Sequence, residues 1–294
     1  MIIVIAKWLG TFHVQTFTMA SGYLFYYLWI EKRKYINIKD SIYNKFKRLI
    51  YPYIFTCIFW VIPITLYFYK YNIKEIFEKY FLMISPSQLW FLIMLFLVFV
   101  FFFIFKNKIK LSTRNLIYVY MLSTLLSMIT RKFNINFFQI SNTIEYMFYF
   151  YIGGYIYKNH KKINFKLTPL YLFLSIILLF FINYLNEYEN YMHYFSDLLM
   201  PLLSFFEILS IYIIFTYISK KIKINNRVYR LLESNSFGIY LFHQQIIYFT
   251  IIMLNGRVSA ILQVSFSFII ALLLSLLMSC MLKKNKYTKK MFGL

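Results

Sequence analysis

Long apolar runs separated by short polar stretches dominate the chain. An α-helix needs about 17 to 25 apolar residues to cross about 30 Å of hydrocarbon. Nine candidate spans follow one another, at 11–30, 49–69, 89–105, 115–130, 143–157, 167–185, 198–218, 237–254 and 258–282. The runs are apolar on every side and lack the period-two alternation of a barrel strand. The pattern therefore predicts an all-α transmembrane bundle of about nine helices, which satisfy their backbone groups internally.

Composition supports the membrane interpretation. Hydrophobic residues make up 61% of the 294 residues and charged residues only 14%, whereas soluble domains have about 45–50% and about 25%. The two cysteines, Cys57 and Cys280, both lie in apolar runs. They favour small buried side chains over a disulfide or a metal site.

The net charge of +22 raises the question of nucleic-acid binding. All 32 Lys and Arg residues fall in the predicted loops and the N-terminal tail, and alternate loops hold 25 of them (31–48, 106–114, 158–166, 219–236 and 283–290). This alternation follows the positive-inside rule, so no nucleic-acid partner is expected. The basic loops and the C-terminus are predicted to be cytoplasmic.

An odd number of spans then places the N-terminus outside. Ten residues precede the first span, and they have neither a charged n-region nor a cleavage site typical of a signal peptide. One more helix upstream of Met1 would bring both ends to the cytoplasm. The sequence therefore raises the expectation of an N-terminally truncated chain.

Several motifs carry a family resemblance. FHVQTFTMASGYLF, at 12–25, resembles the second-helix signature of the acyltransferase-3 family, integral-membrane enzymes that O-acylate sugars of cell-surface polysaccharides. KFKRLIYPYIF at 45–55, QLWFLIMLF at 88–96 and SFGIYLFHQQII at 236–247 resemble later family segments, in order and spacing. FYFYIGGYIY at 148–157 is similar to a midchain family segment.

The resemblance implies a single domain over 1–294 in a ten-helix family. The histidine regarded as catalytic in the family lies near the outer end of its first helix, which would precede Met1 here. Acetyl-CoA or another acyl-CoA would be the co-substrate, with no bound cofactor or metal. A cell-surface or lipid-linked glycan would be the acceptor.

Acyl transfer needs cations for the donor phosphates, a general base for the hydroxyl and donors for the oxyanion. Lys45, Lys47 and Arg48 stand before the apolar run LIYPY. Taken alone they suit a topology anchor that reaches lipid headgroups, whereas the resemblance favours donor binding.

His13, at the outer side of the first span, is the base candidate within this chain, and His243 lies in or beside a late span. His160 and His193 lie in predicted loops. Further pocket or packing candidates share positions in or near spans, and these are Ser21, Gly22, Trp90, Glu145 and Glu207. The two acids are expected to face a partner or a water-filled cavity.

The leading hypothesis is a multi-pass acyltransferase of a bacterial inner or plasma membrane that moves an acyl, expected acetyl, group from a cytoplasmic CoA thioester to a cell-surface carbohydrate. Two alternatives stay open. One is a transporter or flippase for a lipid-linked glycan or small solute, although seven Gly and five Pro give little sign of broken helices. The other is a chain that inserts without catalysing because the helix with the catalytic histidine is missing.

Overall fold

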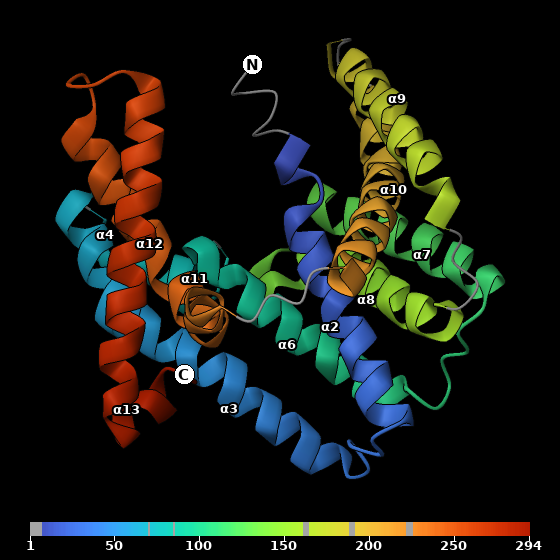
Figure 1. Ribbon diagram of the computed structural model, residues 1–294, viewed down its shortest axis with the longest axis horizontal. Coiled ribbons are helices and arrows are strands. Elements are labelled where there is room, and N and C mark those ends of the chain that lie inside the picture. Colours follow the sequence, from blue (N-terminus) through green and yellow to red (C-terminus); the bar gives the residue numbers. More distant parts are fainter. Residues whose placement is uncertain (1–7, 70, 85, 161–164, 188–191, 222–225) are drawn as a thin grey trace. The chain divides into compact units, whose positions relative to one another are not determined.

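The computed structural model describes residues 8–294 except 70, 85, 161–164, 188–191 and 222–225 (Figure 1). Within these residues every regular element is helical, which confirms the all-α prediction. The α-helices are α2 (His13–Ile30), α3 (Ile38–Thr56), α4 (Ile62–Phe68), α5 (Ile73–Ile76), α6 (Trp90–Phe105), α7 (Thr113–Lys132), α8 (Ile140–Asn159), α9 (Thr168–Glu187), α10 (Met192–Lys221), α11 (Arg227–Leu254), α12 (Ala260–Lys284) and α13 (Lys286–Met291).

The chain divides into two compact units that interleave in sequence. Unit 1 comprises Met1–Ile42 with Leu97–Lys223, and unit 2 comprises Tyr43–Phe96 with Ile224–Leu294. In unit 1, α2 packs on α8, α8 on α7 and α9 on α10. In unit 2, α11 packs along α12.

A helix covers each of the nine predicted spans, but their hydropathy differs. Among the described residues, six helical stretches are long and apolar enough to cross a membrane, and α2, α7 and α8 are not among them. Polar residues such as Gln15, Arg131 and Glu145 lower the hydropathy of those three helices. Twelve of the 20 residues of α8 are buried, so protein surrounds much of this helix. Packing against protein is the reason that α8 accommodates polar residues.

The helices extend well beyond the predicted spans. Ile38 begins α3 and Arg227 begins α11, although these positions were expected in loops. The expectation that every basic residue lies in a loop is therefore wrong. Lys and Arg are good helix formers, and their long side chains allow a helix to continue past the hydrocarbon.

Pro63 shapes the helix that contains α3 and α4. A π-helical turn at Cys57–Val61 joins them, and Pro63 stands at the start of α4. Proline lacks the N–H that would bond to the carbonyl four residues earlier, here that of Phe59. The widened turn accommodates this missing bond, so the chain stays helical from Ile38 to Phe68.

Candidate functional site

The first motif packs against the midchain motif inside unit 1. A Cβ atom on Gly22 would lie 2.1 Å from the Phe150 carbonyl oxygen, and one on Gly153 would lie 2.1 Å from the Met19 carbonyl oxygen. Only glycine fits at either position, so the backbones of α2 and α8 touch directly. Ser21, beside Gly22, is half-buried.

An aromatic cluster surrounds this contact. The Phe25 ring lies 5.2 Å from that of Phe103 and 5.5 Å from that of Phe150, measured between centroids. Phe102 packs 4.5 Å from Phe150. Such tilted ring pairs add to the stabilisation from burial. The cluster holds α2, α6 and α8 together near the end of α2 that carries Tyr26 and Trp29.

Two further motifs meet in unit 2 through a pair of glutamines. Gln88 Nε2 donates to Gln245 Oε1 at 2.8 Å, and Gln245 Nε2 donates to Gln88 Oε1 at 3.0 Å. Gln88 Nε2 also donates to the Leu241 carbonyl at 3.0 Å, and the Tyr240 hydroxyl donates to the Gln88 carbonyl at 2.6 Å. Both amides are buried. Sequence reasoning missed this pair, although Gln within an apolar span is a signal that could have found it.

The three predicted donor-binding residues lie within α3, beyond its first turn. Lys47 Nζ lies 3.9 Å from the centroid of the Tyr43 ring, and Lys290 of α13 also interacts electrostatically with Tyr43. The backbone after α13 packs on α3, since a Cβ on Gly293 would lie 2.7 Å from Pro52 Cγ and 3.4 Å from the Arg48 carbonyl oxygen. Basic residues of α3 and α13 thus share one region of unit 2.

The histidines have a common hydrogen-bond pattern. Nδ1 lies 2.9 Å from the Leu9 carbonyl in His13, 2.7 Å from the Tyr157 carbonyl in His160, and 2.9 Å from the Tyr240 carbonyl in His243. Because a carbonyl can only accept, Nδ1 carries the hydrogen and Nε2 of the neutral ring can accept a proton. His13 is exposed and His243 is half-buried. The side chain of His193 lies outside the described residues.

The two acids within spans have different surroundings. Glu145 forms an ion pair with Arg131. Glu207 is 2% exposed, and its Oε2 accepts a hydrogen bond from Thr11 Oγ1 at 2.8 Å. Among the described residues, Glu207 Oε1 has no hydrogen-bond partner. Trp90 begins α6 and is half-buried.

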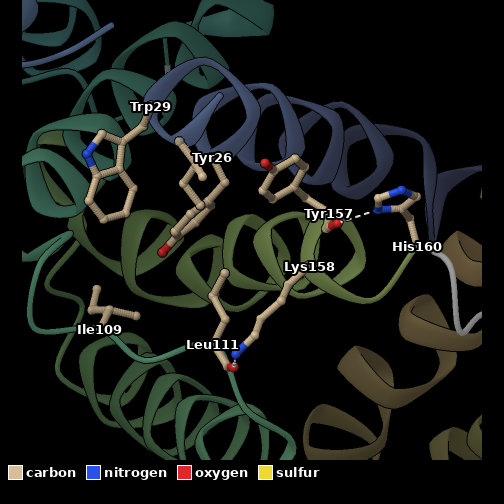
Figure 2. A pocket seen from close by; sticks show the side chains of 8 residues that line it. Tyr26, Trp29, Ile109, Leu111, Tyr157, Lys158 and His160 are labelled. Carbon is tan, nitrogen blue, oxygen red and sulfur yellow. Dashed lines mark hydrogen bonds between the residues drawn. The ribbon is translucent and has the colours of Figure 1, made fainter. Parts of the chain in front are cut away.

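A cavity of about 580 Å³ opens in unit 1 at the end where α2 and α8 finish (Figure 2). Its wall comes from α2, the segment before α7, and the end of α8. The lining residues are Tyr26, Trp29, Ile30, Ile109, Leu111, Tyr157, Lys158 and His160. By the charge alternation, this end is predicted to face the cytoplasm.

Polar groups stand around an otherwise aromatic and aliphatic wall. Lys158 Nζ donates to the Leu111 carbonyl at 2.7 Å. Lys106 donates to the Tyr35 carbonyl, lies 5.6 Å from the Trp29 ring centroid, and has its pKa lowered by burial. Of the lining residues, only His160 was singled out from the sequence, as a loop residue. The cavity depends on three separate segments meeting, which no local pattern indicates.

None of the functional residues expected from the sequence lines this cavity. Ser21, Gly22, His13, Glu145 and Glu207 belong to unit 1. Lys45, Lys47, Arg48, Trp90 and His243 belong to unit 2. The expected residues therefore fall in two separate parts of the chain, and their roles stay predictions.

The chain was compared with protein families, curated proteins and solved structures. A family described as an acyltransferase domain matches residues 2–280. Neither a curated protein nor a solved structure matches the chain. Because the family match covers nearly the whole chain and agrees with its apolar helices, the protein belongs to the acyltransferase-3 family of membrane acyltransferases.

Proposed function

We propose that the protein is an O-acyltransferase that moves an acyl group, expected acetyl, from a cytoplasmic CoA thioester to a hydroxyl of a cell-surface carbohydrate. The observation that carries this proposal is the family match over residues 2–280. The basic residues of α3 and α13 and the histidine geometry support the finer assignment of donor and base.

At the thioester carbonyl carbon the reaction forms one C–O bond and breaks one C–S bond. The acceptor oxygen attacks the thioester carbonyl, the hydroxyl proton passes to a general base, and the tetrahedral intermediate collapses with loss of the CoA thiolate. The thiolate then takes up the proton, so the base is regenerated. A histidine with a free Nε2 near neutral pH suits this role.

His13 is the base candidate within this chain. It is exposed at the start of α2, and its Nδ1 hydrogen bond to the Leu9 carbonyl leaves Nε2 for the substrate hydroxyl. His13 is a different residue from the histidine regarded as catalytic in the family, so its role as the base is a separate hypothesis. Activity of a His13 variant in the present chain tests it.

The donor phosphates are assigned to Lys45, Lys47 and Arg48 of α3, together with the basic residues of α13. A polyphosphate carries several negative charges, and lysine and arginine donate charge-assisted hydrogen bonds to phosphate. Lys47 Nζ lies 3.9 Å from the centroid of the Tyr43 ring, and Lys290 interacts electrostatically with Tyr43. The α3 residues are expected to bind the donor without taking part in the bond changes.

Membrane vesicles that contain the full chain, supplied with labelled acetyl-CoA and candidate glycans, test the proposal. Labelled glycan that depends on the protein is the expected product.

His13→Gln should lower the rate by about 10²–10⁴-fold if His13 is the base, and His160→Gln serves as the matched control. The absence of labelled product even from a version extended by one N-terminal helix contradicts the proposal. Substrate flux without any acyl donor would favour a transporter.

A further inference from the structure

We propose that the cavity of unit 1 binds the phosphodiester headgroup of an anionic membrane lipid. The site consists of the eight residues that line the cavity, with Tyr26 and Lys158 as the polar contacts. It is independent of the acyl-transfer proposal, because none of the donor or base candidates lines it.

Tyr26 provides the first reason to expect a ligand. Its side chain is 1% exposed, and its hydroxyl has no hydrogen-bond partner among the described residues. Leaving a buried hydroxyl unpaired costs about 1–3 kcal/mol. The Tyr26 ring points toward the part of the cavity near Ile109 and Leu111 (Figure 2), so a ligand oxygen there would satisfy the hydroxyl.

The ring of Tyr26 is closely packed between Gly154 and Trp29. A Cβ atom on Gly154 would lie 2.4 Å from Cδ2 and Cε2 of the Tyr26 ring. The ring is also packed 5.8 Å from Trp29, between centroids. Glycine at 154 thus makes the space that the ring of this tyrosine occupies.

Lys158 provides the cation. An ammonium group has three N–H donors, and the structure assigns one of them, at 2.7 Å, to the Leu111 carbonyl. That bond fixes the side chain along the wall (Figure 2), and the ammonium retains donors for a phosphate oxygen. The neighbouring acid Glu31 accepts a hydrogen bond from Tyr157 at 3.2 Å and does not itself line the cavity.

The remaining wall favours a lipid over a soluble phosphate compound. Ile30, Ile109 and Leu111 offer aliphatic contact, and Ile30 is 50% exposed at the end of α2. Trp29 and Tyr157 are the residue types that prefer the headgroup region. Lys158 is the one lysine among the lining residues, and one lysine matches the single negative charge of a phosphodiester, whereas a nucleotide with several phosphates needs more cations. Basic pockets between transmembrane helices on the cytoplasmic side suit anionic headgroups.

Isothermal titration of the full chain in detergent with a short-chain phosphatidylglycerol tests the site. Saturable binding is expected. Lys158→Met should weaken it about tenfold through loss of a charge-assisted bond, and Tyr26→Phe about fivefold through loss of one hydroxyl bond. Lys158→Arg should retain most of the affinity. Thermal melting of each variant checks that it is folded.

Matched controls separate this site from general attraction to a basic surface. Lys108→Met removes one charge, and Tyr27→Phe removes one hydroxyl, from residues that do not line the cavity. Both should leave binding unchanged. Equal weakening by Lys108→Met and Lys158→Met would overturn the proposal, and so would the absence of saturable binding to the unaltered chain.

Titration with inorganic phosphate and with a soluble adenosine bisphosphate distinguishes the source of the phosphate. Both should bind at least tenfold more weakly than the lipid if the aliphatic wall contributes. A bisphosphate that binds more tightly than phosphatidylglycerol, and loses affinity in Lys158→Met, would assign the cavity to a soluble nucleotide and overturn the lipid proposal.

Discussion

Two helix contacts, one in each unit, use opposite means of association. Glycines at 22 and 153 bring the backbones of α2 and α8 into direct contact. In unit 2, Gln88 is joined to α11 by reciprocal amide hydrogen bonds to Gln245 and by a bond to the Leu241 carbonyl. Lipid is as apolar as leucine, so burial of apolar surface alone does little to hold helices together in a membrane. Close packing and interhelical hydrogen bonds are the two remaining means.

This difference predicts that the two helix contacts respond differently to amino-acid substitutions. A backbone-to-backbone contact has no room for an added atom, because neither helix can move a side chain aside. A hydrogen-bonded pair tolerates a change of shape better, but the loss of one partner leaves a buried polar group unsatisfied. Substitutions in the two contacts should therefore lower the free energy of unfolding by different amounts and for different reasons.

The largest effect is expected for Gly153→Ala. The new Cβ would meet the Met19 carbonyl oxygen at 2.1 Å, so α2 and α8 must separate, and the free energy of unfolding should fall by about 3 kcal/mol. Unfolding of the purified protein in mixed micelles measures it. Gly10→Ala is the control, since a Cβ there has nothing within 4 Å. Equal stability of the two variants would show that the α2–α8 contact is looser than described.

The next effect is expected in the glutamine pair. Gln245→Leu leaves the buried Gln88 amide without its reciprocal partner and should lower the free energy of unfolding by about 2 kcal/mol. In the double variant Gln88→Leu with Gln245→Leu, both amides are gone, so part of the loss should be recovered. The same unfolding assay provides the double-mutant cycle. Strictly additive losses would show that the two amides do not interact.

A third variant tests whether residues outside both contacts affect function without affecting stability. Replacement of Lys45, Lys47 and Arg48 by Gln should raise the KM for the acyl donor about tenfold, by loss of phosphate contacts, with little change in kcat or melting temperature. Replacement of Lys32, Arg33 and Lys34 by Gln removes the same charge from the segment before α3 and is the control. An equal rise in KM in both variants would indicate general electrostatic attraction instead of a site.

The smallest effect is expected at the contact of α11 with α12. Ser279 Oγ donates to Asn235 Oδ1 at 2.8 Å, and hydrogen bonds between membrane helices contribute about 0.6 kcal/mol on average. Ser279→Ala should therefore lower the free energy of unfolding by about that amount. Ser236→Ala is the control, because its hydroxyl is exposed and donates to the Glu233 carbonyl of its own helix. A fall in the free energy of unfolding above about 2 kcal/mol would show that this contact contributes as much as the glutamine pair.

The sequence predicted more about helices than about their partners. The runs at 49–69 and 258–282 are long and apolar, and helices cover both. The boundaries were wrong where basic residues continue the helix, as at the start of α3. A span that is apolar on every side has little amphipathic moment, so the face that packs cannot be identified from the pattern. The pairing of Gly22 with Phe150, and of Gln88 with Gln245, therefore could not be predicted.

The candidate site also has features that the sequence indicated and features that it missed. Motifs at 12–25, 45–55, 88–96 and 236–247 indicated the family, and the family match bears this out. Lys45, Lys47, Arg48 and His13 were chosen for their chemistry, and their roles remain to be tested. The cavity residues Tyr26, Trp29 and Lys158 were missed, because a tyrosine or tryptophan near a span end looks like an interfacial anchor and a loop lysine looks like a topology signal.

By itself the sequence determined that this protein is a helical membrane protein of the acyltransferase-3 family. Hydropathy and charge are sums over local stretches, and short motifs are local as well, so these properties can be obtained from the chain alone. Only the tertiary structure decided which glycines touch a neighbouring backbone, which buried amides pair, and where a cavity remains. Each of those depends on residues far apart in the chain meeting at distances of a few ångströms, and similar apolar helices can satisfy their own backbone hydrogen bonds in many different arrangements.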